Sequence, residues 1–116
     1  MLTVKSRQHG TATVIEPSGR IDSTTAKEFE QLIAPPLVAG SHRLVVDLSG
    51  LEYISSAGLR VFLTAAKQCK SAGGALTLCS ASDGVREVFE ISGFSSLFGL
   101  HDSVEAAVKV FGEATA

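Results

Sequence analysis

Residues 44–66 read LVVDLSGLEYISSAGLRVFLTAA, and this stretch decides the fold class. Its first part, LVVDL, is an almost continuous apolar run rich in valine, which is typical of a strand covered on both faces, as in a parallel sheet. After a loop, Leu59, Phe62, Leu63 and Ala66 recur at the spacing of one helix face. The stretch therefore predicts a buried strand, a loop and a helix.

The chain before this stretch predicts a β-hairpin. Residues 2–6 alternate apolar and polar side chains, and residues 11–16 are rich in β-forming types. We expect two short strands that meet at the His9-Gly10 turn. Pro17-Ser18-Gly19 is expected to end the second strand, because proline and glycine interrupt regular structure.

The rest of the chain alternates predicted helices and strands. A capping box, Thr25-x-x-Glu28, starts a helix that Pro35-Pro36 would end, because proline cannot continue the backbone hydrogen-bond ladder. A second box, Asp102-x-x-Glu105, is expected to cap the last helix. The elements between them are the helix from Leu59 ended by Gly73-Gly74, a strand at Leu76–Cys79, a helix from about Asp83 and a short strand over 95–100.

This order of elements predicts an α/β fold. Strands that alternate with helices form parallel sheets whose faces the helices cover. We expect one mixed, largely parallel sheet of about five strands, with an amino-terminal antiparallel hairpin and about four helices. No internal repeat or low-complexity linker divides the sequence, so residues 1–116 are expected to form a single domain.

Composition and charge exclude several functional classes. Ten Lys and Arg residues against twelve Asp and Glu give a net charge of −2, without a block of one sign. A nucleic-acid interface would need a basic stripe. No apolar run approaches the roughly 20 residues that span a bilayer, and the amino terminus lacks the layout of a signal peptide. We therefore expect a cytoplasmic protein that binds neither nucleic acid nor membranes.

Two predicted loops, residues 19–23 and 49–58, follow strands, and functional groups collect at such carboxyl ends. A serine on a strand-to-helix turn would suit a hydrolase, but Ile54 stands where the nucleophile motif needs glycine, and no carboxylate pattern marks a histidine base. Phosphate-loop and metal-ligand spacings are missing, and Cys69 and Cys79 are expected to be buried. The sequence therefore predicts no enzyme, metal or cofactor site.

Ser56 stands at the predicted start of the long helix and admits two interpretations. Its hydroxyl could cap the helix by accepting a hydrogen bond from a free amide of the first turn. Alternatively, a phosphate there would gain from the helix dipole and add about −1.5 to −2 charges without melting the helix. Spacing alone does not choose between the two interpretations.

The residues around Ser56 resemble the signature of the STAS domain, which is found in bacterial anti-sigma factor antagonists. In that family a buried strand ending in D-L/F-S is followed by (D/S)-S-(S/A/T)-G-L at a helix start, and residues 47–59, DLSGLEYISSAGL, are similar to this pattern. The similarity runs in order from about Val4 to Val110. Further matches are GRID at 19–22, GGAL at 73–76 and VREVFEISGF at 85–94.

The resemblance implies a binding switch rather than an enzyme. In the family, the unphosphorylated domain binds an anti-sigma factor that is also a serine kinase with a histidine-kinase-like ATPase fold, and this frees the sigma factor. The kinase then phosphorylates the serine at the helix start, the complex dissociates, and a PP2C-type phosphatase reverses the modification. The resemblance also implies a monomer when free and no cofactor.

By position, the phosphorylated serine would be Ser56, with Ser55 as the alternative because the family often has Asp where this chain has Ser55. The resemblance places a kinase contact at Asp22, whose other interpretation is an Asx turn or helix cap. The alternative function is a constitutive adaptor subunit in another signalling or transport assembly. The residues expected to bind the partner are Asp22, Ser23, Ser55, Ser56, Ala57, Gly58 and Arg60.

Overall fold

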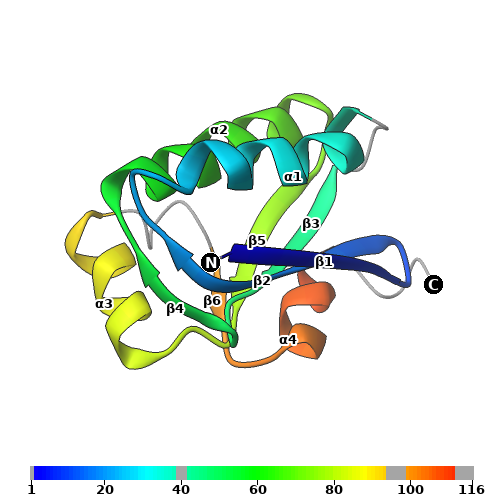
Figure 1. The fold of residues 1–116 in the computed structure, drawn as a ribbon. Helices are drawn as coiled ribbons and strands as arrows, with labels where there is room; N and C mark the ends of the chain where they lie inside the picture. The colour runs from blue at the N-terminus through cyan, green and yellow to red at the C-terminus, as the bar shows by residue number, and fades with distance from the viewer. Residues whose placement is uncertain (1, 39–41, 94–98, 112–116) are drawn as a thin grey trace.

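Six strands form one sheet across residues 2–38, 42–93 and 99–111, which are the residues that the computed structural model describes (Figure 1). The strands are β1 (Leu2–His9), β2 (Ala12–Ile21), β3 (Arg43–Asp47), β4 (Leu51–Ile54), β5 (Ala75–Cys79) and β6 (Leu100–His101). Their order is β1-β2-β3-β5-β6, with β4 also paired to β2. The hairpin is antiparallel and the other pairings are parallel, which confirms the predicted α/β class.

Helices cover both faces of the sheet (Figure 1). They are α1 (Ala26–Val38), α2 (Ser56–Ser71), α3 (Asp83–Ile91) and α4 (Val104–Val108), which continues as a 3₁₀ helix at Lys109–Phe111. The larger core lies between the sheet and α1, α2 and α3, and α4 closes a smaller core on the opposite face. Within the described ranges, none of these helices is long and apolar enough to cross a membrane.

Three phenylalanines, one each from α1, α2 and α3, hold the larger core together. Phe62 of α2 lies between Phe29 of α1 and Phe89 of α3, with ring centroids 5.1 and 5.8 Å away. All three side chains are fully buried. Tilted and edge-on aromatic pairs at this spacing add to the stabilisation that area burial gives. The trio therefore fixes the positions of three helices relative to one another.

The predicted end of the second strand at Pro17 is wrong, because β2 continues to Ile21. β2 pairs with β3 through residues 13–15 and with β4 through residues 19–21. Pro17 falls between these two stretches, so its missing N–H interrupts neither parallel pairing.

The predicted loop at 49–58 contains a strand, β4, so the sheet has one strand more than expected. Its register with β2 slips by one residue, since Gly19 pairs with Leu51 and Arg20 pairs with Tyr53. Glu52 is the extra residue of a β-bulge, which leaves two successive exposed side chains, Glu52 and Tyr53. The bulge interrupts the alternation of buried and exposed side chains by which a strand is recognised in a sequence.

Helix α1 passes through Pro35-Pro36 and ends at Val38, so its predicted end is also wrong. The two prolines deprive the carbonyls of Gln31 and Leu32 of their helical donors. Both of these residues are exposed, so water can take the place of the missing donors. The prolines are therefore tolerated near the end of the helix.

The predicted capping box of α4 is displaced by one residue. Ser103, not Asp102, is the N-cap, and its hydroxyl accepts a hydrogen bond from the Ala106 amide at 3.1 Å. At the start of α1 the Thr25 hydroxyl donates a hydrogen bond to the Arg20 carbonyl at the end of β2, at 2.8 Å, and accepts one from the Asp22 amide at 2.9 Å. Of the strand expected over 95–100, β6 begins at Leu100, and residues 94–98 lie outside the described residues.

Candidate functional site

The two loops singled out in the sequence meet at one end of the sheet. β2 and β4 run parallel, and Ile21 pairs with Ile54 at their carboxyl ends. The Ser55 amide donates a hydrogen bond to the Ile21 carbonyl at 2.8 Å, which ties the start of α2 to the end of β2. Asp22 and Ser56 therefore follow two paired strands and lie on one edge of the molecule.

Ser55 is the N-cap of α2, so the interpretation of Ser56 as the cap is wrong. Ser55 has extended backbone angles, and its hydroxyl accepts a hydrogen bond from the Gly58 amide at 3.3 Å. Ser56 is the first residue of the helix and is exposed. The neighbouring hydroxyls thus have separate positions, one turned into the helix start and one facing solvent.

This division predicts different effects of two alanine substitutions. Ser55→Ala removes the cap and is expected to lower the free energy of unfolding by about 1 kcal/mol. Ser56→Ala is expected to change it by less than about 0.5 kcal/mol, as for other exposed positions. Urea denaturation of the two variants beside the wild type measures the difference. Equal losses would contradict the assignment of the cap.

Gly58 lets α2 approach the sheet closely. A Cβ atom at this position would lie 2.6 Å from Cγ2 of Ile21 and 2.9 Å from Cγ1 of Ile54, both of which are buried. Any larger residue would push the helix start away from β2 and β4. Gly58 is itself buried, so it positions the serine pair and offers no side chain to a partner.

Asp22 organises the loop between β2 and α1. Its Oδ1 accepts hydrogen bonds from the Thr24 amide at 2.9 Å, the Thr24 hydroxyl at 2.6 Å and the Thr25 amide at 3.1 Å. The Thr24 hydroxyl and amide are the main reason that the pKa of Asp22 is lowered from 3.8 to about 2. The Asx-turn interpretation of Asp22 is thus confirmed, and its partner contact stays a prediction.

The pKa of Asp22 predicts a pH dependence of stability. Because its folded-state value is depressed, the carboxylate stabilises the fold above pH 3.8, and this stabilisation is lost as the pH falls through about 2. We expect a carbon NMR titration of the Asp22 carboxyl group to show its midpoint near the lower value. Asp22→Asn keeps an acceptor for the turn and should remove this part of the acid sensitivity. A midpoint at the ordinary value would contradict the hydrogen-bonded turn.

Among the described residues, no histidine lies beside the serine loop, where it could act as the base of a catalytic serine. His9 and His42 lie at the amino-terminal end of the sheet, and His101 lies on β6, across the sheet from β4. Cys69 and Cys79 are buried, as predicted, and desolvation raises the pKa of both thiols to about 11. Across the described ranges no group of three or more His, Cys, Asp or Glu side chains could hold a metal ion.

A family model for the STAS domain matches residues 3–107 of the chain. The chain belongs to the STAS domain family. A protein of Bordetella bronchiseptica named as an anti-sigma factor antagonist, BtrV, is 48% identical over 93 residues, which are 80% of this chain and 80% of that protein.

Solved structures share the fold of this STAS domain. An anti-sigma factor antagonist from Mycobacterium paratuberculosis superposes with a TM-score of 0.86 at 24% identity, over 95% of this chain and 93% of that one. The anti-sigma factor antagonist SpoIIAA in its unphosphorylated form gives a TM-score of 0.79 at 18% identity, over 94% and 96% of the two chains. The phosphorylated form of SpoIIAA, from Bacillus, gives 0.70 at 18% identity, over 94% and 99%.

The predicted partner-binding residues of this STAS domain differ in the solvent exposure of their side chains. Ser23, Ser56 and Arg60 are exposed, and Asp22, Ser55 and Ala57 are half-buried. Ala57 packs against the larger core. The side chains that a partner could reach directly are therefore those of the exposed group and the edges of the half-buried one.

Sequence reasoning missed an exposed cation–π pair beside the site. The guanidinium carbon of Arg20 lies 4.5 Å from the centre of the Tyr53 ring. The two residues are paired across β2 and β4, and both are exposed. Such a contact adds about 0.5–1 kcal/mol at an exposed position. Only the bulge at Glu52 brings these two residues opposite each other, and no pattern in the sequence marks that bulge.

Proposed function

We propose that this STAS domain is an anti-sigma factor antagonist whose partner-binding face is centred on Ser56 and is switched by phosphorylation of that serine. The observation that carries the proposal is the separation of the two serines. Ser55 accepts the capping hydrogen bond, and Ser56 is exposed on the first turn of α2. A kinase could modify Ser56 without removing the cap.

A phosphate on Ser56 would change recognition and leave the fold in place. It would stand at a helix amino terminus, where the free amides and the helix dipole favour negative charge. The modification would add about −1.5 to −2 charges to an edge that already carries the ionised Asp22. A partner that fits the unmodified edge would then meet repulsion and unpaired charge.

The family role supports the identity of the partners. The relative BtrV and the fold neighbour SpoIIAA are both named as anti-sigma factor antagonists, and SpoIIAA has been solved with and without phosphate. We infer that this chain, when unmodified, holds an anti-sigma factor that is also a serine kinase. A PP2C-type phosphatase would restore the unmodified state. The domain would act in the cytoplasm, as a monomer when free, and by binding rather than by catalysis.

Phosphopeptide mapping of the chain isolated from its host, together with its intact mass, tests the proposal. One phosphoryl group on Ser56 that a phosphatase removes is the expected result. A phosphate on Ser55 would move the switch by one residue. A chain that stays unmodified under several growth conditions would contradict the switch and favour the constitutive adaptor. The adaptor is the alternative because this chain has Ser55 where the family often has Asp before the phosphorylated serine.

A further inference from the structure

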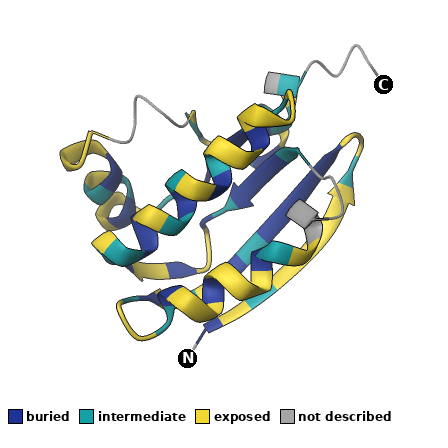
Figure 2. Cartoon of the chain, turned by 90° about the horizontal axis from the view of Figure 1, so that it is seen from above, coloured by how far each residue is buried: buried dark blue, intermediate teal, exposed yellow. Residues whose placement is uncertain are grey.

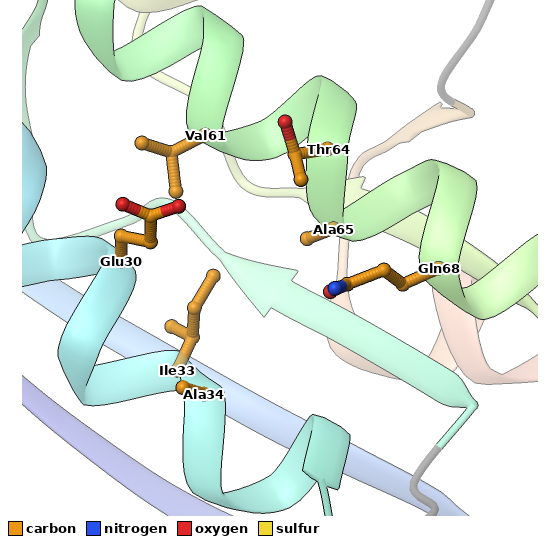
Figure 3. Close-up of a pocket in the computed structure, with 7 residues that line it drawn as sticks. All are labelled: Glu30, Ile33, Ala34, Val61, Thr64, Ala65 and Gln68. Carbon is orange, nitrogen blue, oxygen red and sulfur yellow. The ribbon is translucent and has the colours of Figure 1, made fainter.

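Figure 2 shows α1 and α2 next to each other above the sheet, with exposed residues along the outer side of each helix. A groove lined by residues of both helices lies between them (Figure 3). It has a volume of about 120 Å³, several times the space that one water needs. Its lower walls are apolar and come from Ile33 and Ala34 of α1 and from Val61 and Ala65 of α2. The small side chains of the two alanines leave room between helices that otherwise pack closely.

Polar groups stand at the rim of this groove. Figure 3 shows the Glu30 carboxylate directed from α1 toward Val61, and the Gln68 amide directed from α2 back toward α1. In the part of the chain that the structure describes, neither side chain has a hydrogen bond or an ion pair. Thr64 adds an exposed hydroxyl on the α2 side. The groove thus combines an apolar floor with an unpaired carboxylate and an unpaired amide.

We propose that this groove receives an arginine side chain of the protein that binds the Ser56 face. The inference rests on the proposed function, because it assigns a second contact to the same partner. The aliphatic stem of the arginine would lie on Ile33, Val61 and the alanines. Its guanidinium would bridge the Glu30 carboxylate and the carbonyl oxygen of Gln68.

The chemistry of the rim favours arginine over other side chains. The negative charge of Glu30 selects a cation, and the apolar floor selects a cation on a long aliphatic stem. A guanidinium offers five donors in a fixed plane, so it can serve two acceptors on opposite helices, whereas the ammonium of lysine acts as a compact point charge. Arginine is also enriched among the residues that dominate binding at protein interfaces.

The groove is continuous with the Ser56 face along α2. Ser56, Arg60, Thr64 and Gln68 recur every fourth residue and are all exposed, so each lies beside the next in a row that winds slowly around the helix. With a rise of 1.5 Å per residue, Thr64 lies about 12 Å along the helix from Ser56. A partner that buries roughly 800 Å² on this chain would cover both positions.

The groove itself can be tested without the partner. We would titrate the nitrogen-labelled full chain with n-propylguanidinium, and follow the backbone amides by NMR. Saturable shifts are expected at Ala34, Thr64, Ala65 and Gln68. Glu30→Gln should weaken this binding at least fivefold, and Glu28→Gln, an exposed carboxylate of α1 outside the groove, should leave it unchanged. The neutral isostere n-propylurea should bind at least fivefold more weakly.

Two results of this titration would overturn the inference. One is a set of shifts scattered over the surface, or no shift at the groove. The other is equal binding of n-propylurea and n-propylguanidinium, which would mean that the Glu30 carboxylate does not favour a cation over a neutral group of the same shape.

The second arm uses the anti-sigma factor of the same host and measures its affinity by calorimetry. Glu30→Lys is expected to weaken the complex at least tenfold, and Glu28→Lys by less than twofold. If the wild type binds and Glu30→Lys binds equally well, the arginine contact is wrong and the proposed function stands. If the wild type does not bind, the proposed function fails and the inference fails with it.

Discussion

Replacing Phe62 with alanine is expected to lower the free energy of unfolding by about 3–5 kcal/mol. Phe62 is fully buried and touches a phenylalanine ring on each side, at 5.1 and 5.8 Å between centroids. Its truncation would remove apolar contacts and leave a cavity that three helices cannot all close at once. Urea denaturation followed by circular dichroism measures the loss. For a small domain this is a large fraction of the total stability.

Ile91→Ala is the matched control, because it also truncates an apolar side chain of the helical layer. Ile91 is 78% exposed, so its loss is expected to change stability by less than about 0.5 kcal/mol. Similar losses for the two variants would mean that the aromatic trio does not hold the helices together.

Phosphorylation of Ser56 is expected to weaken binding of the anti-sigma factor by about 3–4 kcal/mol, or roughly 100- to 1,000-fold. The phosphate would place about two negative charges on an edge that the partner covers, and part of that charge would lose its water without gaining a counter-ion. Calorimetric titration of the phosphorylated and unmodified chains measures the difference. Ser56→Asp should have the same direction and a smaller effect, because it adds one charge.

Ser56→Ala is the control for this experiment. It should keep partner binding within about twofold of the wild type, since the side chain is exposed and does not cap the helix. It should also prevent phosphorylation by the kinase. If Ser56→Ala abolished binding while the fold stayed intact, the hydroxyl would be a contact rather than a switch.

Much of the fold could be predicted because its elements have regular hydrophobic periods. Buried positions hold apolar residues, so a regular pattern of burial can be read from the sequence. This is true of the valine-rich run of β3 and of the helical spacing of Leu59, Phe62 and Ala66. The hairpin, β5 and the positions of all four helices follow the same rule. Patterns fail where a local irregularity breaks the period.

The missed features at the serine loop share one physical reason, which is that they depend on contacts distant in sequence. The bulge at Glu52 is defined by pairing with β2, more than thirty residues earlier, and so is the Arg20–Tyr53 contact. The choice between Ser55 and Ser56 as cap depends on the end of β2. There the Ser55 N–H donates a hydrogen bond to the Ile21 carbonyl. Adjacent serines are equivalent by type, and only tertiary position separates them.

The double pairing of β2 also has an evolutionary meaning. Residues 13–15 fix β3, and with it the core, whereas residues 19–21 fix β4 and the serine loop, and the two stretches share no residue. Substitutions within residues 19–21 or in β4 would therefore alter the serine loop without changing the pairing of β2 with β3. One end of the strand can be inherited unchanged while selection adapts the other to new partners.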